Sequence, residues 1–521
     1  MKYRFKLQFN FKNIRPQIPS EKLSEYLKLF AFPVITAVFV FPFSAPLKNV
    51  VIPLFSVIFV LLVLFPDIVK SASRQLIRNA ILIVSVCLIF SAMFLGHLFY
   101  YNFSNYDFGD IACYLSSFYK LIYSFPGTNI VWGKPLLAMH SEFTSIPVAW
   151  IFQLFPHPTT LLILQCIPVL AAWLLFRKWI YNTVEDSLSA ELLALSVALS
   201  PWILSPLLRG YHGISTGLPL FVLASVALLQ KKWRLFLFAV PLLLLVKEIC
   251  VLTVFWIGVL AFLQKYEKKW YVYPIVLSIL YGIFLKYFYF PLLLGEQSYY
   301  FSYMIGKFDV KVFIKTFATY LVTVYLMSGN ISVFKTKVSL MVIPAAGLNS
   351  FLGNQFVSPQ FHYIVEPVFW GTVASVFGFS KNGESVVWSR LRAVSSVVTM
   401  VFLSTFLVRG LPVYSEHVYQ KSYTTGLKQI LPGESVSDGA PLVGYLWKAD
   451  RLSWVIYDDI KKDIDKIILQ KNNSPVWCLP SEFERVKQFE NDVRHDSAYS
   501  VIWEDDIIVV FGRGARSDSL Q

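Results

Sequence analysis

The chain has little charge for its length. Only 15% of its 521 residues are Asp, Glu, Lys or Arg, whereas 56% are hydrophobic and 17% are aromatic. The mean hydropathy is +0.57. This shortage of charge excludes an ordinary soluble domain. Cysteine is scarce too: the five cysteines show no C-x-x-C or metal spacing, and four of them lie in or beside apolar segments as small core residues.

Three other features are absent. No small-residue cleavage site follows the basic N-terminal segment, so we interpret residues 1–28 as an uncleaved cytoplasmic tail. The net charge is +14, but the basic residues form no single stripe that would bind nucleic acid; they stand in small groups between apolar runs. No internal repeat is evident, which disfavours a transporter built from two repeated halves.

Long apolar runs recur from residue 29 to residue 410. A helix of about 18 or more apolar residues crosses a hydrocarbon core of about 30 Å, whereas barrel strands alternate over about ten residues. The runs therefore predict an all-α polytopic membrane protein with about thirteen transmembrane helices. We expect them near 29–45, 50–66, 80–99, 159–178, 189–206, 214–230, 234–247, 249–264, 271–290, 311–328, 338–352, 363–379 and 393–410.

The loops between these runs predict the topology. Basic residues gather in every second loop, at 70–78, 177–178, 231–234, 265–269, 335–337 and 381–392. The positive-inside rule places these loops and the N-terminus in the cytoplasm of a plasma or inner membrane protein. We divide the chain into a basic tail 1–28, helices 29–99, a large exoplasmic loop 100–158, a helical core 159–410 and an extracytoplasmic domain 411–521.

The C-terminal segment has a different character. Its charge is balanced, and the runs "SWVIYDDI" (453–460), "SPVWCL" (474–479) and "DDIIVVFGR" (505–513) are typical of strands. About 110 residues is enough for a small α/β domain.

Polar residues placed beside apolar runs are the most informative ones in a membrane protein. They cluster on the predicted outer side, at Asp107, Asp110, His140, Glu142, Arg209, His212, Lys247, Glu248, Gln360, His362, Tyr363 and Glu366. The cytoplasmic loops offer mainly Lys and Arg. This asymmetry predicts that any chemistry takes place at the outer face.

Each of these motifs has two interpretations. Asp110 suits the N-cap of a helix that begins near Ile111, or else one of the pair Asp107 and Asp110 is a general base or helps to hold a divalent cation. In "VKEIC", Lys247 and Glu248 either snorkel or pair in a short hairpin, or Lys247 binds a lipid-linked phosphate while Glu248 orients it or meets Arg209. The lone residues His212 and His362 are structural or site residues. His157, between two prolines, indicates a turn before the next helix.

The order of the motifs "NYDFGDIACY", "LLAMHSEF", "SPWILSPLLRGYHG", "LLLLVKEICVL" and "SPQFHYIVEPVFW" resembles a prokaryotic membrane family, domain of unknown function 2079. The C-terminal stretches "GLKQILPGESVSDGAPLVGYLWKADRLSWVIYDD" and "YSVIWEDDIIVVFGRG" extend this resemblance, which covers about 100–513. The family is grouped with the C-type (GT-C) glycosyltransferases.

This resemblance implies a GT-C-like helical core whose first large exoplasmic loop carries an acidic motif and which acts on a polyprenyl-phosphate-linked sugar. Asp107 matches the Tyr-Asp element of the family, and Asp110 is the second acid. His212 is retained in "RGYHG", where an Arg-Gly pair replaces an acid. Ile249 follows the Lys-Glu pair of "VKEIC", where the family often has another acid. Two additional N-terminal helices precede the loop.

A hexosyl or pentosyl transfer of this kind needs a carboxylate as base and positive charge at the leaving phosphate. Asp107 or Asp110 is the expected base, and both are the expected ligands if a divalent cation, Mg or Mn, takes part. The expected phosphate-binding residues are Arg209, His212 and Lys247, with supporting roles for His140, Glu142, Glu248, His362 and Tyr363.

The expected partners are the lipid-linked sugar donor, membrane lipid and a glycan, lipid or protein acceptor, with no nucleic acid. Two other functions stay open. A multi-span transporter or flippase of lipid or solute would place its ionisable groups and broken helices near the bilayer midplane. A non-catalytic membrane scaffold would use the acids only as helix caps and turn formers.

Overall fold

The structure is a computed structural model. It describes residues 74–101, 108–121, 136–294, 309–352, 362–380, 386–409, 417–439, 442, 445–446, 448–449, 452–454, 464–471 and 480–514. The helices expected at 29–45 and 50–66 and the strand expected at 474–479 lie outside these residues.

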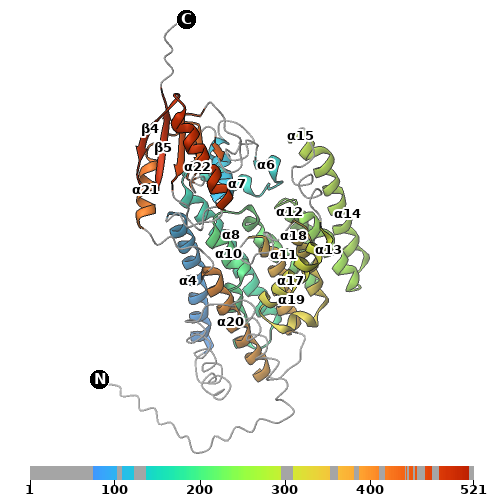
Figure 1. The fold of residues 1–521 in the computed structure, drawn as a ribbon. Helices are drawn as coiled ribbons and strands as arrows, with labels where there is room; N and C mark the ends of the chain where they lie inside the picture. Colours follow the sequence, from blue (N-terminus) through green and yellow to red (C-terminus); the bar gives the residue numbers. More distant parts are fainter. Residues whose placement is uncertain are drawn as a thin grey trace, which may run out of the picture.

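The described chain is mostly helical, and a helix lies at or near each of the other expected segments (Figure 1). The long body consists of α4 (Arg74–Tyr101), α8 (Pro158–Thr183), α9 (Ser187–Ala198), α10 (Pro201–Arg209), α11 (Leu218–Leu229), α12 (Trp233–Leu244), α13 (Cys250–Leu263), α14 (Lys268–Phe284), α17 (Val310–Met327), α18 (Val342–Leu352), α19 (Val365–Ser380) and α20 (Val386–Arg409). His157 is the N-cap of α8 and accepts a hydrogen bond from the Thr159 amide, as a turn before that helix requires.

Not all of these helices can cross a membrane alone. In the described part of the chain, five are long and apolar enough, at Arg78–Leu98, Pro158–Thr183, Ser187–Leu208, Lys268–Leu293 and Val310–Met327. By contrast α12 has 12 residues and α13 has 14. At 1.5 Å per residue these two are about 18–21 Å long, shorter than a hydrocarbon core of about 30 Å. The protein is thus an integral membrane protein in which some of the apolar helices are shorter than a full span.

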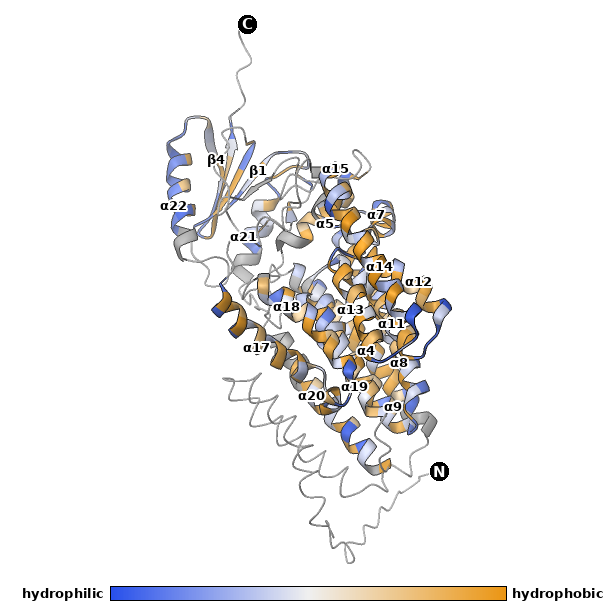
Figure 2. Ribbon diagram, turned by 90° about the vertical axis from the view of Figure 1, so that its right-hand side faces the viewer, coloured by the Kyte–Doolittle hydropathy of each residue, from blue (hydrophilic) through white to orange (hydrophobic). Residues whose placement is uncertain are grey.

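Several short elements gather at one end of the helical body. These are α5 (Phe108–Lys120), α6 (Leu136–Met139), α7 (Ser145–Leu154), the 3₁₀ helix η2 (Gly213–Gly217) and α15 (Phe290–Leu294). Figures 1 and 2 both place α7 and α15 at the same end of the molecule as the C-terminal sheet. The segment predicted as a large exoplasmic loop is therefore partly helical.

The C-terminal part forms a five-stranded mixed sheet in the order β2-β1-β3-β5-β4. Its strands are β1 (Val436–Gly439), β2 (Leu452–Trp454), β3 (Lys466–Gln470), β4 (Tyr499–Glu504) and β5 (Ile508–Arg513), with helices α21 (His417–Leu427) and α22 (Pro480–His495). The first three strands in this order are parallel, and β5 and β4 are antiparallel to their neighbours. A small α/β unit was predicted here, but only β2 and β5 had been expected among the described strands.

The sheet domain touches the helical body through an aromatic contact. The rings of Tyr445 and Tyr100 lie 4.7 Å apart between centroids, and the Tyr445 hydroxyl donates a hydrogen bond to the Tyr100 carbonyl. Tyr445 also packs on the buried cluster that includes Ile111 and Leu115 of α5. The C-terminal domain thus lies against the end of the body at which α5 begins.

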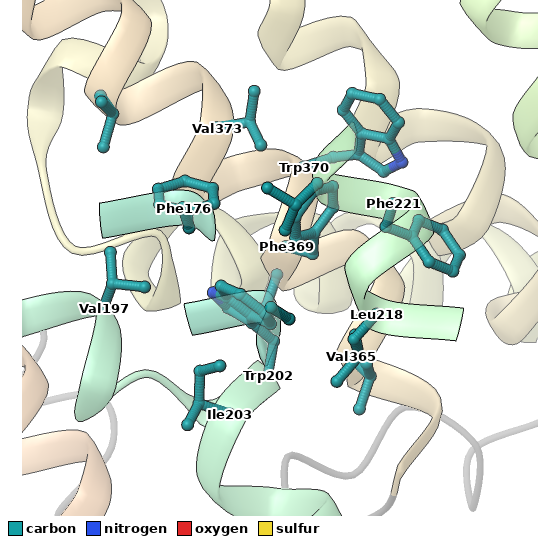
Figure 3. Close-up of a cluster of buried hydrophobic side chains, with 14 of the residues drawn as sticks. Phe176, Val197, Trp202, Ile203, Leu218, Phe221, Val365, Phe369, Trp370 and Val373 are labelled. Atoms are coloured by element: carbon teal, nitrogen blue, oxygen red, sulfur yellow. The ribbon is translucent and has the colours of Figure 1, made fainter. Parts of the chain in front are cut away.

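The core of the body is aromatic. Phe369 of α19 contacts Phe176 of α8, Trp202 of α10 and Phe221 of α11, with ring centroids 5.2–6.1 Å apart (Figure 3). Edge-to-face contacts of this kind pack densely and add to the burial of apolar area. They fix α10 and α11 relative to each other, and η2 is held between these two helices.

Close packing between α4 and α10 depends on Gly96. A Cβ at this position would overlap the carbonyl oxygen of Leu207, which is backbone and cannot rotate away. Small residues at such contacts let membrane helices approach closely. We expect Gly96→Ala to lower the free energy of unfolding by about 2 kcal/mol, measured by denaturant unfolding in detergent micelles. An unchanged unfolding midpoint would contradict this close approach.

Candidate functional site

Two charged residues interrupt the apolar pair α12 and α13. Lys247 and Glu248 lie in the connection between the end of α12 at Leu244 and the start of α13 at Cys250. Both are paired with the segment 140–142. Lys247 Nζ lies 3.1 Å from Glu142 Oε1, and His140 Nδ1 lies 2.7 Å from Glu248 Oε1. We call Glu142–Lys247 and His140–Glu248 the twin pairs, since they join the same two segments.

The carboxylate of Glu142 is completely buried, with 0% of its side chain exposed. Its Oε2 accepts a hydrogen bond of 2.8 Å from the Tyr114 hydroxyl of α5. That hydroxyl accepts one of 3.1 Å from the Gly213 amide. Burial, together with the nearby Glu142 charge, raises the pKa of Tyr114, so the hydroxyl stays protonated as a donor. A buried charge needs partners of this kind, and Glu142 has both a cation and a neutral donor.

Gly213, the first residue of η2, provides the space for this carboxylate. A Cβ on Gly213 would overlap Glu142 Oε2. The connection from α10 to η2 must therefore carry a glycine at this point, so that the backbone can lie directly against the acid.

Gln165 of α8 supports the same connection. Its amide nitrogen donates to the Gly210 carbonyl at 2.8 Å, and its Oε1 accepts from the His212 amide at 2.7 Å. One side chain thus satisfies a carbonyl and an N–H that the end of α10 leaves without helical partners. His212 is 3% exposed, so its ring lies inside the protein beside η2.

Glu248 is the more open acid of the twin pairs, with 30% of its side chain exposed. Its Oε2 accepts a hydrogen bond of 3.1 Å from the Ser141 amide. Burial alone would raise the pKa of Glu248, but the neighbouring His140 and then Lys247 lower it to about 2. Glu248 is consequently ionised at neutral pH. Lys247 and Glu248 thus each contact the segment 140–142, and the two side chains hold it from one connection.

The structure brings together four of the predicted residues in the twin pairs. Asp107 lies outside the described residues. Asp110 lies in the first turn of α5, which begins at Phe108, so its interpretation as the N-cap is wrong. Arg209 is the last residue of α10. The side chains of Asp110, Arg209 and His362 are not among those described, and their roles stay predictions.

Two other predicted residues lie on α19 and just before it. Tyr363, in the 3₁₀ turn η7 (His362–Ile364), accepts a hydrogen bond of 2.9 Å from Asn349 through its carbonyl. Glu366 is buried in the first turn of α19 and accepts a hydrogen bond from the Thr253 hydroxyl of α13. Neither contact involves the twin pairs.

Sequence reasoning missed three residues that build the site, namely Tyr114, Gln165 and Gly213. Gln165 could have been identified from the sequence. It is a polar amide inside the apolar run "LLILQCIPVL", where burying a polar side chain costs free energy unless it has a role. Tyr114 follows Asp110 by four residues and so shares its helix face. Gly213 gave no local signal, since its role arises from a contact with a residue 71 positions earlier.

The described residues contain no group of three or more His, Cys, Asp or Glu side chains that could hold a metal ion. The predicted ligands of a divalent cation, Asp107 and Asp110, are not tested by this finding.

The helical body with its five candidate spans among the described residues, the polar connection and the small C-terminal sheet define a polytopic membrane protein with a buried charged site at one end. The model of a predicted membrane protein family, DUF2079, matches residues 96–510. The match covers most of the chain, so this protein belongs to that family. No curated protein matches the chain.

Proposed function

We propose that this protein is a GT-C-like glycosyltransferase that takes a hexosyl or pentosyl group from a polyprenyl-phosphate donor at the exoplasmic face. In this proposal the N-terminus is cytoplasmic and the C-terminal domain is extracytoplasmic. Asp107 or Asp110 is the base that accepts the proton of the acceptor hydroxyl. The acceptor is a glycan, a lipid or a protein that binds near the C-terminal domain.

The observation that carries this proposal is the position of Lys247. It is a largely buried cation, 15% exposed, in a break between two apolar helices. A donor whose tail stays in the bilayer needs positive charge near the interface to bind its phosphate and to stabilise the leaving group. Glu142 fixes the ammonium group beforehand, which avoids reorganisation when the phosphate arrives.

The surrounding backbone supports the same chemistry. Arg209 and His212 flank the tight connection that packs against Glu142, and α5 brings Asp110 onto the helix that also carries Tyr114. Glu142 and its hydrogen bond to Tyr114 therefore connect α5, which carries the candidate base, with the connection that carries Arg209 and His212. Glu142, Tyr114 and Gln165 act as positioning residues.

Asparagine variants of the two acids test this proposal. We expect Asp107→Asn or Asp110→Asn to lower sugar transfer from a radiolabelled polyprenyl-phosphate donor by about a hundredfold or more, because a general base contributes at least that much. Asp492→Asn on the exposed face of α22 is the matched control and should keep full activity. Full transfer by both separate site variants, with the fold intact, would rule out the proposed base.

One observation favours a second candidate, a carrier of an anionic lipid or solute. The short helices α12 and α13 meet at a charged connection, as the broken helices of many transporters do. Proteoliposomes that contain a fluorescent polyprenyl-phosphate lipid distinguish the two functions. A carrier moves this lipid between leaflets without an acceptor, whereas a transferase gives product only when an acceptor is present.

A further inference from the structure

Two pairs of consecutive helices in the described body are joined by nearly identical turns. The first joins α11 to α12 through residues 230–232, and the second joins α13 to α14 through residues 264–267. The Lys232 amide donates to the Ala227 carbonyl at 2.8 Å, and the Tyr266 amide donates to the Ala261 carbonyl at 3.0 Å. Both turns therefore end the preceding helix with the same motif, in which an amide N–H donates a hydrogen bond to the carbonyl five residues earlier.

A lysine occupies the left-handed position in each turn. Lys231 has φ 53° and Lys265 has φ 57°, and these are the two non-glycine residues with positive φ in the described chain. Glycine is the usual residue at this position, because a Cβ there is unfavourable. Two lysines thus stand at positions where glycine would be less strained. This indicates that their positive charge serves a function.

The two turns together are strongly basic. Their exposed charged residues are the six cations Lys231, Lys232, Arg234, Lys265, Lys268 and Lys269 and the single acid Glu267. Six cations against one acid give a net charge of five positive. Lys337 adds a further exposed cation beside the second turn, since its ammonium group donates a hydrogen bond to the Leu263 carbonyl at the end of α13. Figure 2 shows hydrophilic ribbon beside α11 and α12, adjoining hydrophobic helices.

Aromatic side chains join the two turns into one surface. Trp233 contacts Trp270, with ring centroids 5.1 Å apart. Lys231 Nζ lies 4.7 Å from the centroid of the Tyr266 ring, and Lys269 Nζ lies 5.7 Å from that of Trp233. Further along the helices, Phe238 and Phe262 are 60% and 59% exposed. This sequence of lysine, tryptophan and exposed phenylalanine is typical of the boundary between headgroups and acyl chains.

We propose that the two turns form one binding surface for the headgroups of anionic phospholipids. The surface has the complementary charge, the partly exposed rings of Trp233 and Tyr266 suit the interfacial layer, and the exposed phenylalanines suit the acyl chains. Its backbone is fixed by the two helix-ending motifs, so the cations are held in place before lipid binds.

This surface is separate from the proposed transferase site. The twin pairs lie at the other ends of α12 and α13, about 18–21 Å away along those helices. The outcome of a lipid-binding experiment is therefore independent of whether the protein transfers a sugar.

Native mass spectrometry of the full chain in detergent tests the proposal with phosphatidylglycerol against phosphatidylcholine. We expect preferential binding of phosphatidylglycerol and a loss of about twenty- to thirtyfold in its affinity in Lys231→Gly/Lys265→Gly, since each lysine near an anionic headgroup contributes about fivefold. Glycine is the favoured residue at both positions, so this variant should fold at least as well as the parent. Lys232→Gln/Lys268→Gln provides a second variant that leaves the left-handed positions unchanged.

The matched control is Lys421→Ala/Lys428→Ala, which removes two exposed lysines from the region of α21 in the sheet domain. It should bind phosphatidylglycerol like the parent. An equal loss in the control and in the turn variants would mean that only net charge matters, and would overturn the proposal. Absence of a phosphatidylglycerol preference in the parent would do the same, as would displacement of the lipid by inorganic phosphate at constant ionic strength.

Discussion

Glu142→Gln is expected to lower the free energy of unfolding by about 3 kcal/mol. Glutamine keeps the shape and an oxygen for the Tyr114 hydroxyl, but it removes the negative charge that lies 3.1 Å from the ammonium group of Lys247, whose side chain is 15% exposed. Removing one partner of a buried ion pair is strongly destabilising, because the remaining charge is then buried alone. Denaturant unfolding in detergent micelles, followed by near-UV circular dichroism, measures the change.

A double-mutant cycle separates the charge effect from packing. Lys247→Met should destabilise by a similar amount, and Glu142→Gln/Lys247→Met should recover much of the loss, because no uncompensated charge remains. If the two single effects simply add, the pair contributes nothing as a pair, and the twin pairs do not hold the α12–α13 connection. Glu484→Gln and Lys487→Met, which break an exposed ion pair of 3.0 Å on α22, are the matched controls and should each change stability little.

Gly213→Ala is expected to lower the free energy of unfolding by about 3 kcal/mol and to reduce transfer activity with it. The added methyl group would occupy the place of Glu142 Oε2. The acid would have to move away from Lys247 and Tyr114, so that overpacking is combined with the loss of both contacts. The same unfolding assay measures stability, and transfer from the polyprenyl-phosphate donor measures function.

The matched control for this prediction is Gly347→Ala. Gly347 lies in α18, and a Cβ there would meet only Phe317, at 3.9 Å. Alanine in an unobstructed helix position should stabilise the protein by about 0.5–1 kcal/mol, because it loses less conformational entropy on folding than glycine. The same substitution is thus expected to act in opposite directions at the two sites. A neutral Gly213→Ala would show that the connection between α10 and η2 can move away from the acid.

The positions of the helices followed from apolar runs, but their ability to cross the membrane did not. Composition marks residues 234–247 and 249–264 as apolar, and helices form at both. Their lengths depend on where α12 ends and α13 begins around Lys247 and Glu248. Hydropathy averaged over a window of residues does not locate these helix ends. Five helices reach the length and hydropathy of a full span among the described residues, against about thirteen expected over the whole chain.

The sheet domain, too, was predicted only in part from the sequence. Its existence was predicted from the change in composition after residue 410 and from strand-like runs at β2 and β5. The strands β1, β3 and β4 were missed. The apolar residues of β3, Ile467, Ile468 and Leu469, form a run too short to be distinguished from a helix segment, and β4 is largely exposed. Their pairing is non-local, so it depends on tertiary contacts and not on any single stretch.

The amino-acid sequence by itself determined that this is a helical membrane protein with polar residues gathered beside its apolar runs. An ionisable residue is costly in the low dielectric of the bilayer, so such residues are rare there and easily identified in the sequence. It could not determine which of these residues meet. The partners Glu142 and Lys247 are 105 positions apart, and their contact also requires Tyr114 and Gly213. Only the tertiary structure brought them together, because a buried charge is stable where several distant segments supply its counter-charge and its hydrogen bonds at once.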